Sequence, residues 1–317
     1  MTFDALRFPA NKPFDVVGLG EIAIDHLCIV PRAPGMPDKV RMSRYEAQGG
    51  GQVATAMVAC QRLGLKTKFL GKVGDDDDGR LSIDELLREG VDASGVRVAK
   101  GAATQLAVIL IDEHSGERTV VWNCDEESML RPSELRREEV VQARALHIDA
   151  TGLAFGLEPL QWAREAGVVT SIDIDHLLPD TAAALELVDL CIVPETFPRE
   201  LTGERDLERA MRAMHEVNPR AVLCVTLGAE GCIAWDDGAL VREPAFRVRP
   251  IDTTACGDVF HAAFLFAALQ GYPLRRAMRF SNAAAAIKTL KLGGRPGIPT
   301  LAEVEKLLAL SPHAPAT

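Results

Sequence analysis

The segment 252–258 places two aspartates and several small residues directly before an apolar stretch. Its residues are, in order, Asp252, Thr253, Thr254, Ala255, Cys256, Gly257 and Asp258. Small residues let backbone N–H groups turn toward a ligand, and the helix predicted over 258–269 directs its positive dipole end to the same place. The segment therefore predicts an anion site, and phosphate is the anion that such sites commonly hold.

Asp258 stands at the mouth of this predicted anion site. A carboxylate there repels the anion that the backbone attracts, so we interpret Asp258 as a general base. The alternative is an ordinary carboxylate at a helix N-terminus, which the helix dipole favours without any catalytic role. Cys256 is interpreted as a small space-filling residue rather than a nucleophile.

Strand patterns alternate with helical patterns along most of the chain. Strands are predicted at 68–73, 145–148, 168–172, 190–193 and 221–226, and helices at 52–63, 81–89, 258–269 and 273–290. Apolar strands joined by helices predict a parallel sheet covered on both faces, with ligands at the carboxyl ends of its strands. Gly293 and Gly294 are predicted to cap the last helix.

The apolar run that begins at Asp15 is predicted to be the first strand of this sheet, and Asp25 ends it. Glycines at 49–51 precede the helix over 52–63 and would let the backbone approach a ligand closely. Two β-rich segments, 104–112 and 118–122, are separated by only five residues and predict a hairpin rather than a helical crossover. We expect this hairpin to belong to a separate small sheet.

The composition sets the broad class of protein. With 317 residues, 47% of them hydrophobic, the chain can bury a large core. A net charge of −10 opposes a nucleic-acid footprint, and the longest apolar run is far shorter than the ~20 residues of a membrane span. The seven cysteines are dispersed and lack the spacing of a zinc site, which is typical of reduced thiols. No signal peptide is visible either, so we expect a cytoplasmic protein.

Two segments resemble the signatures of the ribokinase-like (PfkB) carbohydrate kinases. Segment 252–258 is similar to the second signature, commonly D-T-x-G-A-G-D, with Ala255 and Cys256 at its variable small positions. Segment 49–64 is similar to the first, a Gly-Gly turn opening a helix that ends in R-L-G. Shorter matches follow in the family's order, among them 73–79, 90–92, 201–203 and 226–231, so the resemblance runs from about Val16 to Leu308.

The resemblance implies an α/β, ribokinase-like fold with a central, mostly parallel sheet between helices and a small β-sheet lid. The core would comprise residues 14–27, 49–98 and 123–310, and the inserted lid residues 28–48 and 99–122. The implied activity is ATP-dependent transfer of the γ-phosphoryl group to a sugar hydroxyl. A homodimer that pairs through the lid is expected, because lid sheets of this kind have exposed edges.

The resemblance also implies roles for individual residues. Asp258 would be the base, and the amides of Ala255, Cys256 and Gly257 would form the anion hole. The sugar would be held by residues near the first signature, namely Asp25, Gly50, Gly51, Gln52 and Thr55. The nucleotide would lie along Thr226, Gly228 and Gly231, with Asn282 near adenine.

Magnesium is expected with ATP, but the family's N-x-x-E motif is altered here. Pro194 and Phe197 occupy its Asn and Glu positions, which leaves Glu195 as the nearby carboxylate. A monovalent cation such as K⁺ is a further possibility near Asp252.

Several residues bear on the substrate without deciding it. Thr55 stands where many relatives carry Asn, which indicates a substrate other than ribose. Arg41, Arg44 and Arg118 flank the expected small sheet, where they would either bind an anionic sugar, such as an anionic ketose, or be ordinary surface charges. A nucleoside kinase of the same fold remains an alternative, although 5% aromatic residues offer few partners for a base. A non-catalytic sugar or nucleotide sensor is the second alternative.

Four more residues lie outside the motifs. Asp173 and Asp175 alternate along the end of a predicted strand, so both could face the cleft. His147 and His261 are interpreted as packing residues rather than metal ligands, since neither has a partner at ligand spacing.

Overall fold

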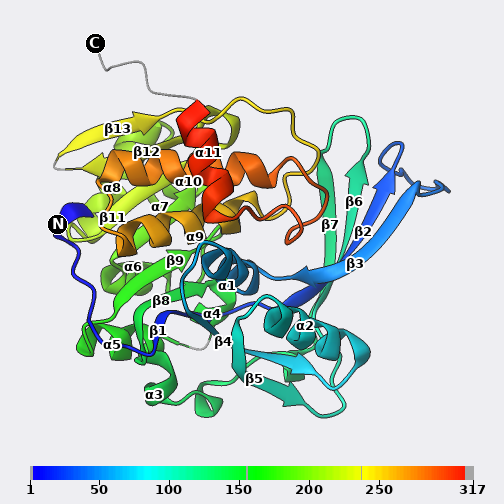
Figure 1. Cartoon of the computed structure of the whole chain (residues 1–317), viewed down its shortest axis with the longest axis horizontal. Coiled ribbons are helices and arrows are strands. Elements are labelled where there is room, and N and C mark those ends of the chain that lie inside the picture. Colours follow the sequence, from blue (N-terminus) through cyan, green and yellow to red (C-terminus); the bar gives the residue numbers. More distant parts are fainter. Residues whose placement is uncertain (1–2, 155, 237, 311–317) are drawn as a thin grey trace.

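Residues 3–154, 156–236 and 238–310 are described in the computed structural model, and they form one large sheet, one small sheet and helices on both faces of the large sheet (Figure 1). The small sheet stands apart at one end of the molecule, at the right of Figure 1. Within the described residues no helix has the length and apolar character that crossing a membrane requires.

The large sheet has nine strands in the order β13-β12-β11-β10-β9-β8-β1-β4-β5. Their bounds are β1 Phe14–Leu19, β4 Thr67–Gly74, β5 Asp92–Ala99, β8 Ala143–Asp149, β9 Val169–Asp173, β10 Leu190–Pro194, β11 Val222–Thr226, β12 Cys232–Asp236 and β13 Ala239–Glu243. The strands from β11 to β5 are parallel, and β12 and β13 add an antiparallel edge. The prediction of a mostly parallel sheet is confirmed.

Helices cover both faces of this sheet. One face carries α1 Gln52–Arg62, α2 Asp77–Arg88, α9 Cys256–Leu269, α10 Leu274–Lys288 and α11 Leu301–Leu310. The other carries α3 Arg137–Val140, α4 Ala150–Leu153, α5 Glu158–Glu165, α6 Thr181–Leu187, α7 Thr196–Thr202 and α8 Leu207–Val217. Short 3-10 turns lie at Phe3–Ala5, Glu126–Ser128, Pro132–Glu134 and Gly228–Glu230.

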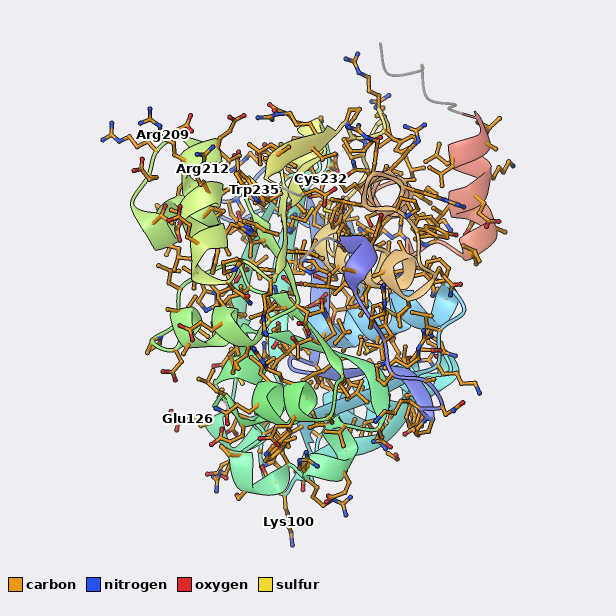
Figure 2. The ribbon with its side chains drawn as sticks, turned by 90° about the vertical axis from the view of Figure 1, so that its left-hand side faces the viewer. Lys100, Glu126, Arg209, Arg212, Cys232 and Trp235 are labelled. Carbon is orange, nitrogen blue, oxygen red and sulfur yellow. The ribbon has the colours of Figure 1, made fainter. Side chains whose placement is uncertain are left out.

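Apolar residues on both sheet faces explain why the strands are near-continuous hydrophobic runs. In β8, for example, Leu146 and Ile148 pack into one face cluster and Ala145 into the other. Helix α9 is buried from Val259 to Leu269 because it lies against both α1 and α10. At the antiparallel edge, the Arg212 guanidinium of α8 lies 5.6 Å from the ring centre of Trp235 in β12 (Figure 2).

The small sheet has the order β3-β2-β6-β7, with bounds β2 Ala23–Val30, β3 Arg44–Gly50, β6 Leu106–Asp112 and β7 Arg118–Asn123. The predicted hairpin is confirmed, since β6 and β7 pair antiparallel with Ile111 opposite Arg118. Strand β6 alternates between buried and half-buried residues, whereas all six residues of β7 are exposed. The sheet therefore has one covered face and an open outer edge.

Two predictions about local structure were wrong. The first apolar run is not one strand: β1 ends at Leu19, and Asp25 lies inside β2 of the small sheet. The strand is interrupted at Gly20, where the Cβ of any other residue would lie 2.4 Å from an Asp149 carboxylate oxygen. Gly293 does not cap α10, which ends at Lys288. Its N–H instead donates to Asp252 Oδ2 at 2.7 Å, and its backbone has a left-handed φ of 86°.

Candidate active site

Asp258 lies in the first turn of α9, at the place where segment 252–258 joins the helix. The residue before the helix, Ala255, adopts a left-handed backbone with φ 62°. A non-glycine residue in that region carries strain of about 1–2 kcal/mol, and such strain is commonly found at functional sites. The segment is therefore held in a shape that its sequence alone does not favour.

Asp252 organises this segment from beneath. It is fully buried and accepts hydrogen bonds from the N–H groups of Thr254 at 2.8 Å and Gly293 at 2.7 Å. The buried Lys288 ammonium donates to the Asp252 carbonyl at 3.0 Å. The Cys256 N–H, one of the three amides expected to hold an anion, donates to the Thr253 carbonyl at 3.3 Å, a long hydrogen bond that a stronger acceptor can replace.

Acidic side chains gather around Asp258. Burial first, and then the charges of Asp25 and Asp149, raise the pKa of Asp258 to about 7. Burial likewise raises the pKa of Asp25 to about 6, that of Asp149 to about 6 and that of Glu21 to about 8. For Asp173, burial and then the charge of Asp258 raise the pKa well above its ordinary value. The site thus holds a carboxyl group whose pKa suits proton acceptance near neutral pH.

Two cations balance part of this negative charge. Arg118, from β7 of the small sheet, donates from Nη1 to the Thr253 hydroxyl at 2.7 Å. The positive charges of Arg118 and Lys288 both act to lower the pKa of Asp258. Of the three arginines flanking the small sheet, Arg118 therefore reaches the site, whereas Arg44 pairs with Glu46 and Arg41 is exposed.

The residues expected to hold the sugar meet where the small sheet joins α1. Asp25 of β2 lies against Gly50 of β3, because a Cβ on Gly50 would be 2.3 Å from Asp25 Oδ1. Gly51 precedes α1 with φ 86°, and a Cβ there would lie 2.6 Å from the Glu21 carbonyl oxygen. Glycine is thus required at both positions. Gln52 and the buried Thr55 follow in the first turn of α1.

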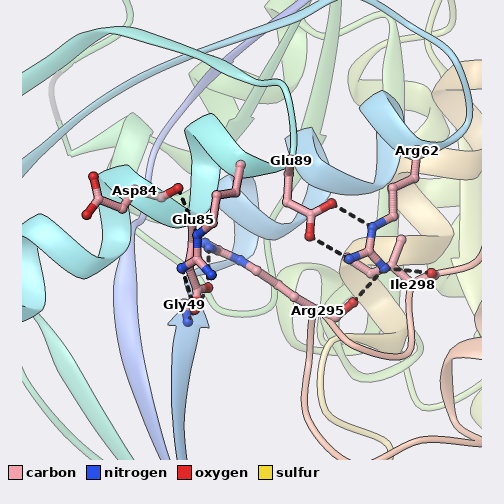
Figure 3. A network of polar contacts seen from close by, with 8 residues as sticks. Gly49, Arg62, Asp84, Glu85, Glu89, Arg295 and Ile298 are labelled. Atoms are coloured by element: carbon pink, nitrogen blue, oxygen red, sulfur yellow. Dashed lines mark hydrogen bonds and ion pairs between the residues drawn. The ribbon is translucent and has the colours of Figure 1, made fainter.

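An ionic network that the sequence did not reveal, centred on the buried Arg295, holds this glycine turn (Figure 3). Arg295 donates to the Gly50 carbonyl at 3.1 Å and to Glu85 at 3.0 Å, and Glu85 accepts the Gly49 N–H at 2.7 Å. Arg62 binds Glu89 through two hydrogen bonds and also donates to the Arg295 carbonyl at 2.9 Å. The network ties the C-terminal loop to the turn beside Asp25. Its members lie too far apart in the sequence for any local pattern to predict their contacts.

Two of the residues expected to hold the nucleotide, Gly231 and Asn282, lie beside the same loop. Gly231 has φ 100°, and a Cβ on it would lie 2.2 Å from the Glu243 carbonyl oxygen. Asn282 of α10 donates its amide to the same carbonyl at 3.1 Å and to that of Pro244 at 3.2 Å. Gly228, with φ 57°, opens the turn that follows Thr226 at the end of β11.

Glu195 follows β10, at the same edge of the sheet. The preceding residue, Pro194, pairs in register with Thr226, so Glu195 lies next to the strand that leads into the expected nucleotide loop. Its carboxylate is half exposed and forms a 3.9 Å ion pair with Arg199. Asp149 and Asp173 end the next strands along this edge, β8 and β9.

The geometry defines a class of site: a carboxyl group at a helix N-terminus, beside buried acidic residues and cations, at the carboxyl edge of a parallel sheet. Comparison with known proteins identifies the class. Residues 14–301 match the model of the pfkB family carbohydrate kinase, and the chain belongs to this family. It is therefore a carbohydrate kinase, an ATP-dependent phosphotransferase that acts on a hydroxyl of a sugar.

Individual relatives match over nearly the whole chain. The chain is 31% identical to a probable fructokinase-5 of Arabidopsis thaliana, over 94% of this chain and 98% of that one. It is 30% identical to a ribokinase of Haemophilus influenzae, over 92% and 97% of the two chains. The structure of Arabidopsis thaliana ribokinase complexed with ribose and ATP has a TM-score of 0.78 at 22% identity, over 94% of this chain and 99% of that one. The last likeness concerns the fold, and it confirms a ribokinase-like architecture.

Proposed function

We propose that this kinase phosphorylates a ketose, and that Asp258 removes the proton from the attacked hydroxyl. The observation that supports this proposal most directly is the position of Asp258. It lies in the first turn of α9, and the charge of Asp25 acts on it. The name fructokinase, which several relatives bear, supports a ketose. These relatives do not favour a nucleoside acceptor, and the intact pair Gly257-Asp258 argues against a non-catalytic sensor.

The proposed mechanism assigns each residue a physical task. Asp25 accepts hydrogen bonds from sugar hydroxyls while Gly50, Gly51, Gln52 and Thr55 shape the pocket. Deprotonated Asp258 accepts the proton of the attacking hydroxyl as the new bond from the sugar oxygen to the γ-phosphorus forms. The bond between the γ-phosphorus and the β,γ-bridging oxygen breaks, and ADP leaves. The N–H groups of Ala255, Cys256 and Gly257, with the guanidinium of Arg118, stabilise the charge on the transferring phosphoryl group. The proton stays on Asp258 until the product leaves.

The nucleotide is proposed to lie along Thr226, Gly228 and Gly231, with adenine near Asn282. The half-exposed carboxylate of Glu195 at this edge is suited to a hard cation held partly through water, as Mg²⁺ is. Bound Mg²⁺ would neutralise charge on the β- and γ-phosphates. A monovalent cation near Asp252 is also proposed, supported by the loop in which Asp252 accepts the Gly293 N–H.

The segments 28–48 and 99–122 are proposed to act as a lid over a core of residues 14–27, 49–98 and 123–310. The hydrogen bond from Arg118 of β7 to Thr253 supports this role, because it joins the small sheet to the anion-site segment. Closing such a lid would exclude water and limit hydrolysis of ATP. A cytoplasmic location is proposed from the seven free cysteines.

The substrate class is tested by measuring ADP release over a panel of fructose, ribose, anionic ketoses that carry a phosphate or sulfonate, and adenosine. We expect acceptor-dependent ADP release with a ketose and none with adenosine. Stronger activity with an anionic ketose would agree with the position of Arg118. No acceptor-dependent release from any ketose would overturn the proposed substrate class.

The pH dependence of kcat/KM should follow the ionisation of Asp258. Because the pKa of Asp258 is raised to about 7 and only the carboxylate can accept a proton, kcat/KM should rise as the pH rises through about 7. Rates measured at limiting sugar across that range, with saturating ATP, report the ionisation of the enzyme–ATP complex that binds the sugar. A flat profile across the same range would contradict this assignment.

Replacing Arg118 by Met should lower kcat/KM by about 10- to 100-fold, since a charge-assisted hydrogen bond contributes roughly 1.5–3 kcal/mol. The rising limb of the pH profile should also shift to higher pH, because Arg118 lowers the pKa of Asp258 and its removal raises that pKa. Arg44→Met is the matched control, since Arg44 lies on the same small sheet but pairs with Glu46. Equal rates for the two variants would refute a role for Arg118.

A homodimer through the small sheet is proposed from the exposed apolar residues on its β7 edge, Val120, Val121 and Trp122, of which Trp122 is 65% exposed. Light scattering during size-exclusion chromatography should give the mass of a dimer for the wild type and of a monomer for Trp122→Glu. Leu177→Glu, at an exposed apolar residue outside the small sheet, should leave the dimer intact. A monomeric wild type would refute the proposal.

A further inference from the structure

Three buried side chains from different elements meet near the catalytic end of the sheet. They are His147 of β8, Asp173 at the end of β9 and His261 of α9, and their exposed fractions are 1%, 5% and 4%. His261 lies one helical turn after Asp258. None of these three residues has a task in the proposed phosphoryl transfer.

The three side chains are close enough to share one ligand. One candidate ligand atom from each lies within 4.8 Å of the others. His261 Nε2 and Asp173 Oδ1 are 3.3 Å apart, and the two imidazole ring centres are 5.7 Å apart. Ligands of a tetrahedral ion with bonds of about 2.0–2.1 Å lie about 3.3 Å from one another. The His261–Asp173 pair already has this spacing, and a modest shift of His147 would complete it.

Both histidines keep a buried nitrogen without a hydrogen-bond partner in the described structure: Nε2 of His147 and Nδ1 of His261. A buried polar atom left unsatisfied costs about 1–3 kcal/mol, so a guest that engages His147 Nε2 would be favoured. In His261 the nitrogen that faces Asp173 is Nε2, so the same guest would not engage His261 Nδ1. The other nitrogen of His147, Nδ1, lies 3.1 Å from the Ser171 hydroxyl. Metal-binding histidines are commonly oriented in this way, with one nitrogen held by a neighbour and the other directed at the ion.

The electrostatic surroundings favour a cation. Asp173 lies within the range of the charges of Asp258, Asp149 and Glu21, which together make this end of the sheet strongly acidic. A histidine coordinates a metal through a neutral imidazole nitrogen. A divalent ion would offset part of this negative charge.

We propose that His147, Asp173 and His261 form a buried binding site for a divalent transition metal, with Zn²⁺ as the representative ion. Two imidazoles and one carboxylate match the donor preferences of Zn²⁺ and leave a fourth position open. The site differs from that of nucleotide-bound Mg²⁺, which prefers oxygen ligands in octahedral geometry. The sequence could not indicate it, because its ligands lie on three elements with no recognisable spacing.

The test measures metal content directly and does not depend on kinase activity. The full-length chain is stripped with a chelator, incubated with excess Zn²⁺, dialysed and analysed by elemental mass spectrometry. Wild type should retain about one Zn²⁺ per chain, and the double variant His147→Gln/His261→Gln should retain none. The matched control His114→Gln/His176→Gln changes two exposed histidines and should retain the wild-type amount.

A milder variant covers the case in which the double variant does not fold. Ser171→Ala removes only the hydroxyl beside His147 Nδ1 and should weaken Zn²⁺ affinity about 10- to 100-fold. Co²⁺ substituted into the wild type should give the visible absorption bands of a four- or five-coordinate ion with nitrogen and oxygen ligands. The proposal is overturned if stripped wild type takes up no Zn²⁺, if both double variants retain equal amounts, or if the Co²⁺ spectrum indicates thiolate ligands from the cysteines.

Discussion

Asp258→Asn is expected to lower kcat by about 10²- to 10⁴-fold, the usual contribution of a general base. Asn has the shape of Asp but cannot accept the proton of the sugar hydroxyl. Binding of ATP should be unchanged or slightly tighter, because the substitution removes a negative charge beside the predicted anion site. Single-turnover rates of sugar phosphorylation, with ATP affinity measured by calorimetry, separate the two effects.

A matched control distinguishes catalysis from helix capping. Asp206 precedes α8 and accepts the N–H of Arg209 at 2.9 Å, so it is a plain carboxylate at a helix N-terminus. Asp206→Asn should leave kcat unchanged. If Asp258→Asn also retains wild-type kcat and alters only the unfolding temperature, Asp258 is a structural carboxylate and the mechanism is wrong.

Asp25→Asn should raise the sugar KM and lower kcat/KM by roughly 10²-fold, while leaving the KM for ATP unchanged. The carboxylate is proposed to accept hydrogen bonds from two sugar hydroxyls, and hydrogen bonds to a charged group contribute about 1.5–3 kcal/mol each. Replacing one oxygen by an NH₂ group turns one acceptor into a donor that faces another donor. Steady-state kinetics with each substrate varied in turn measures the effect.

Glu46→Gln provides the control for Asp25. Glu46 lies on the neighbouring strand β3 and forms a surface ion pair with Arg44, an interaction that contributes little to stability. Its substitution should change neither KM. An Asp25→Asn enzyme with the wild-type sugar KM would place the sugar elsewhere.

The sequence predicted the elements whose patterns are local. Parallel strands are apolar on both faces, so a run of neighbouring apolar residues predicts them. The glycine turns and the small residues of 252–258 are required by backbone geometry, so they too can be predicted from neighbouring residues. The partial burial of Asp258 and its electrostatic contact with Asp25 follow from the packing of α9 against the strand ends. The strained φ of Ala255 was not predictable, because alanine rarely adopts it.

Features that depend on distant residues were missed or misplaced. Asp25 was assigned to the end of the first strand because nothing nearby in the sequence marks the break at Gly20. The side chain that a Cβ on Gly20 would meet is Asp149, 129 residues later in the sequence. The antiparallel strands β12 and β13 were not predicted. Strand β13 carries mostly exposed and half-exposed residues, whereas β12 begins with the buried residues Cys232, Ile233 and Ala234. The Arg295–Glu85 network joins residues 210 positions apart, and no local pattern marks such a pair.

The central claim is that Asp258 serves as the base for phosphoryl transfer from ATP to a sugar. Its most direct test is mass spectrometry of the products formed from ATP and a ketose, with ADP measured in the same reaction. Wild type should produce one sugar phosphate for each ADP, and Asp258→Asn should produce almost none while still binding ATP. Formation of sugar phosphate at equal rates by both proteins, or release of ADP without any sugar phosphate, would contradict the account.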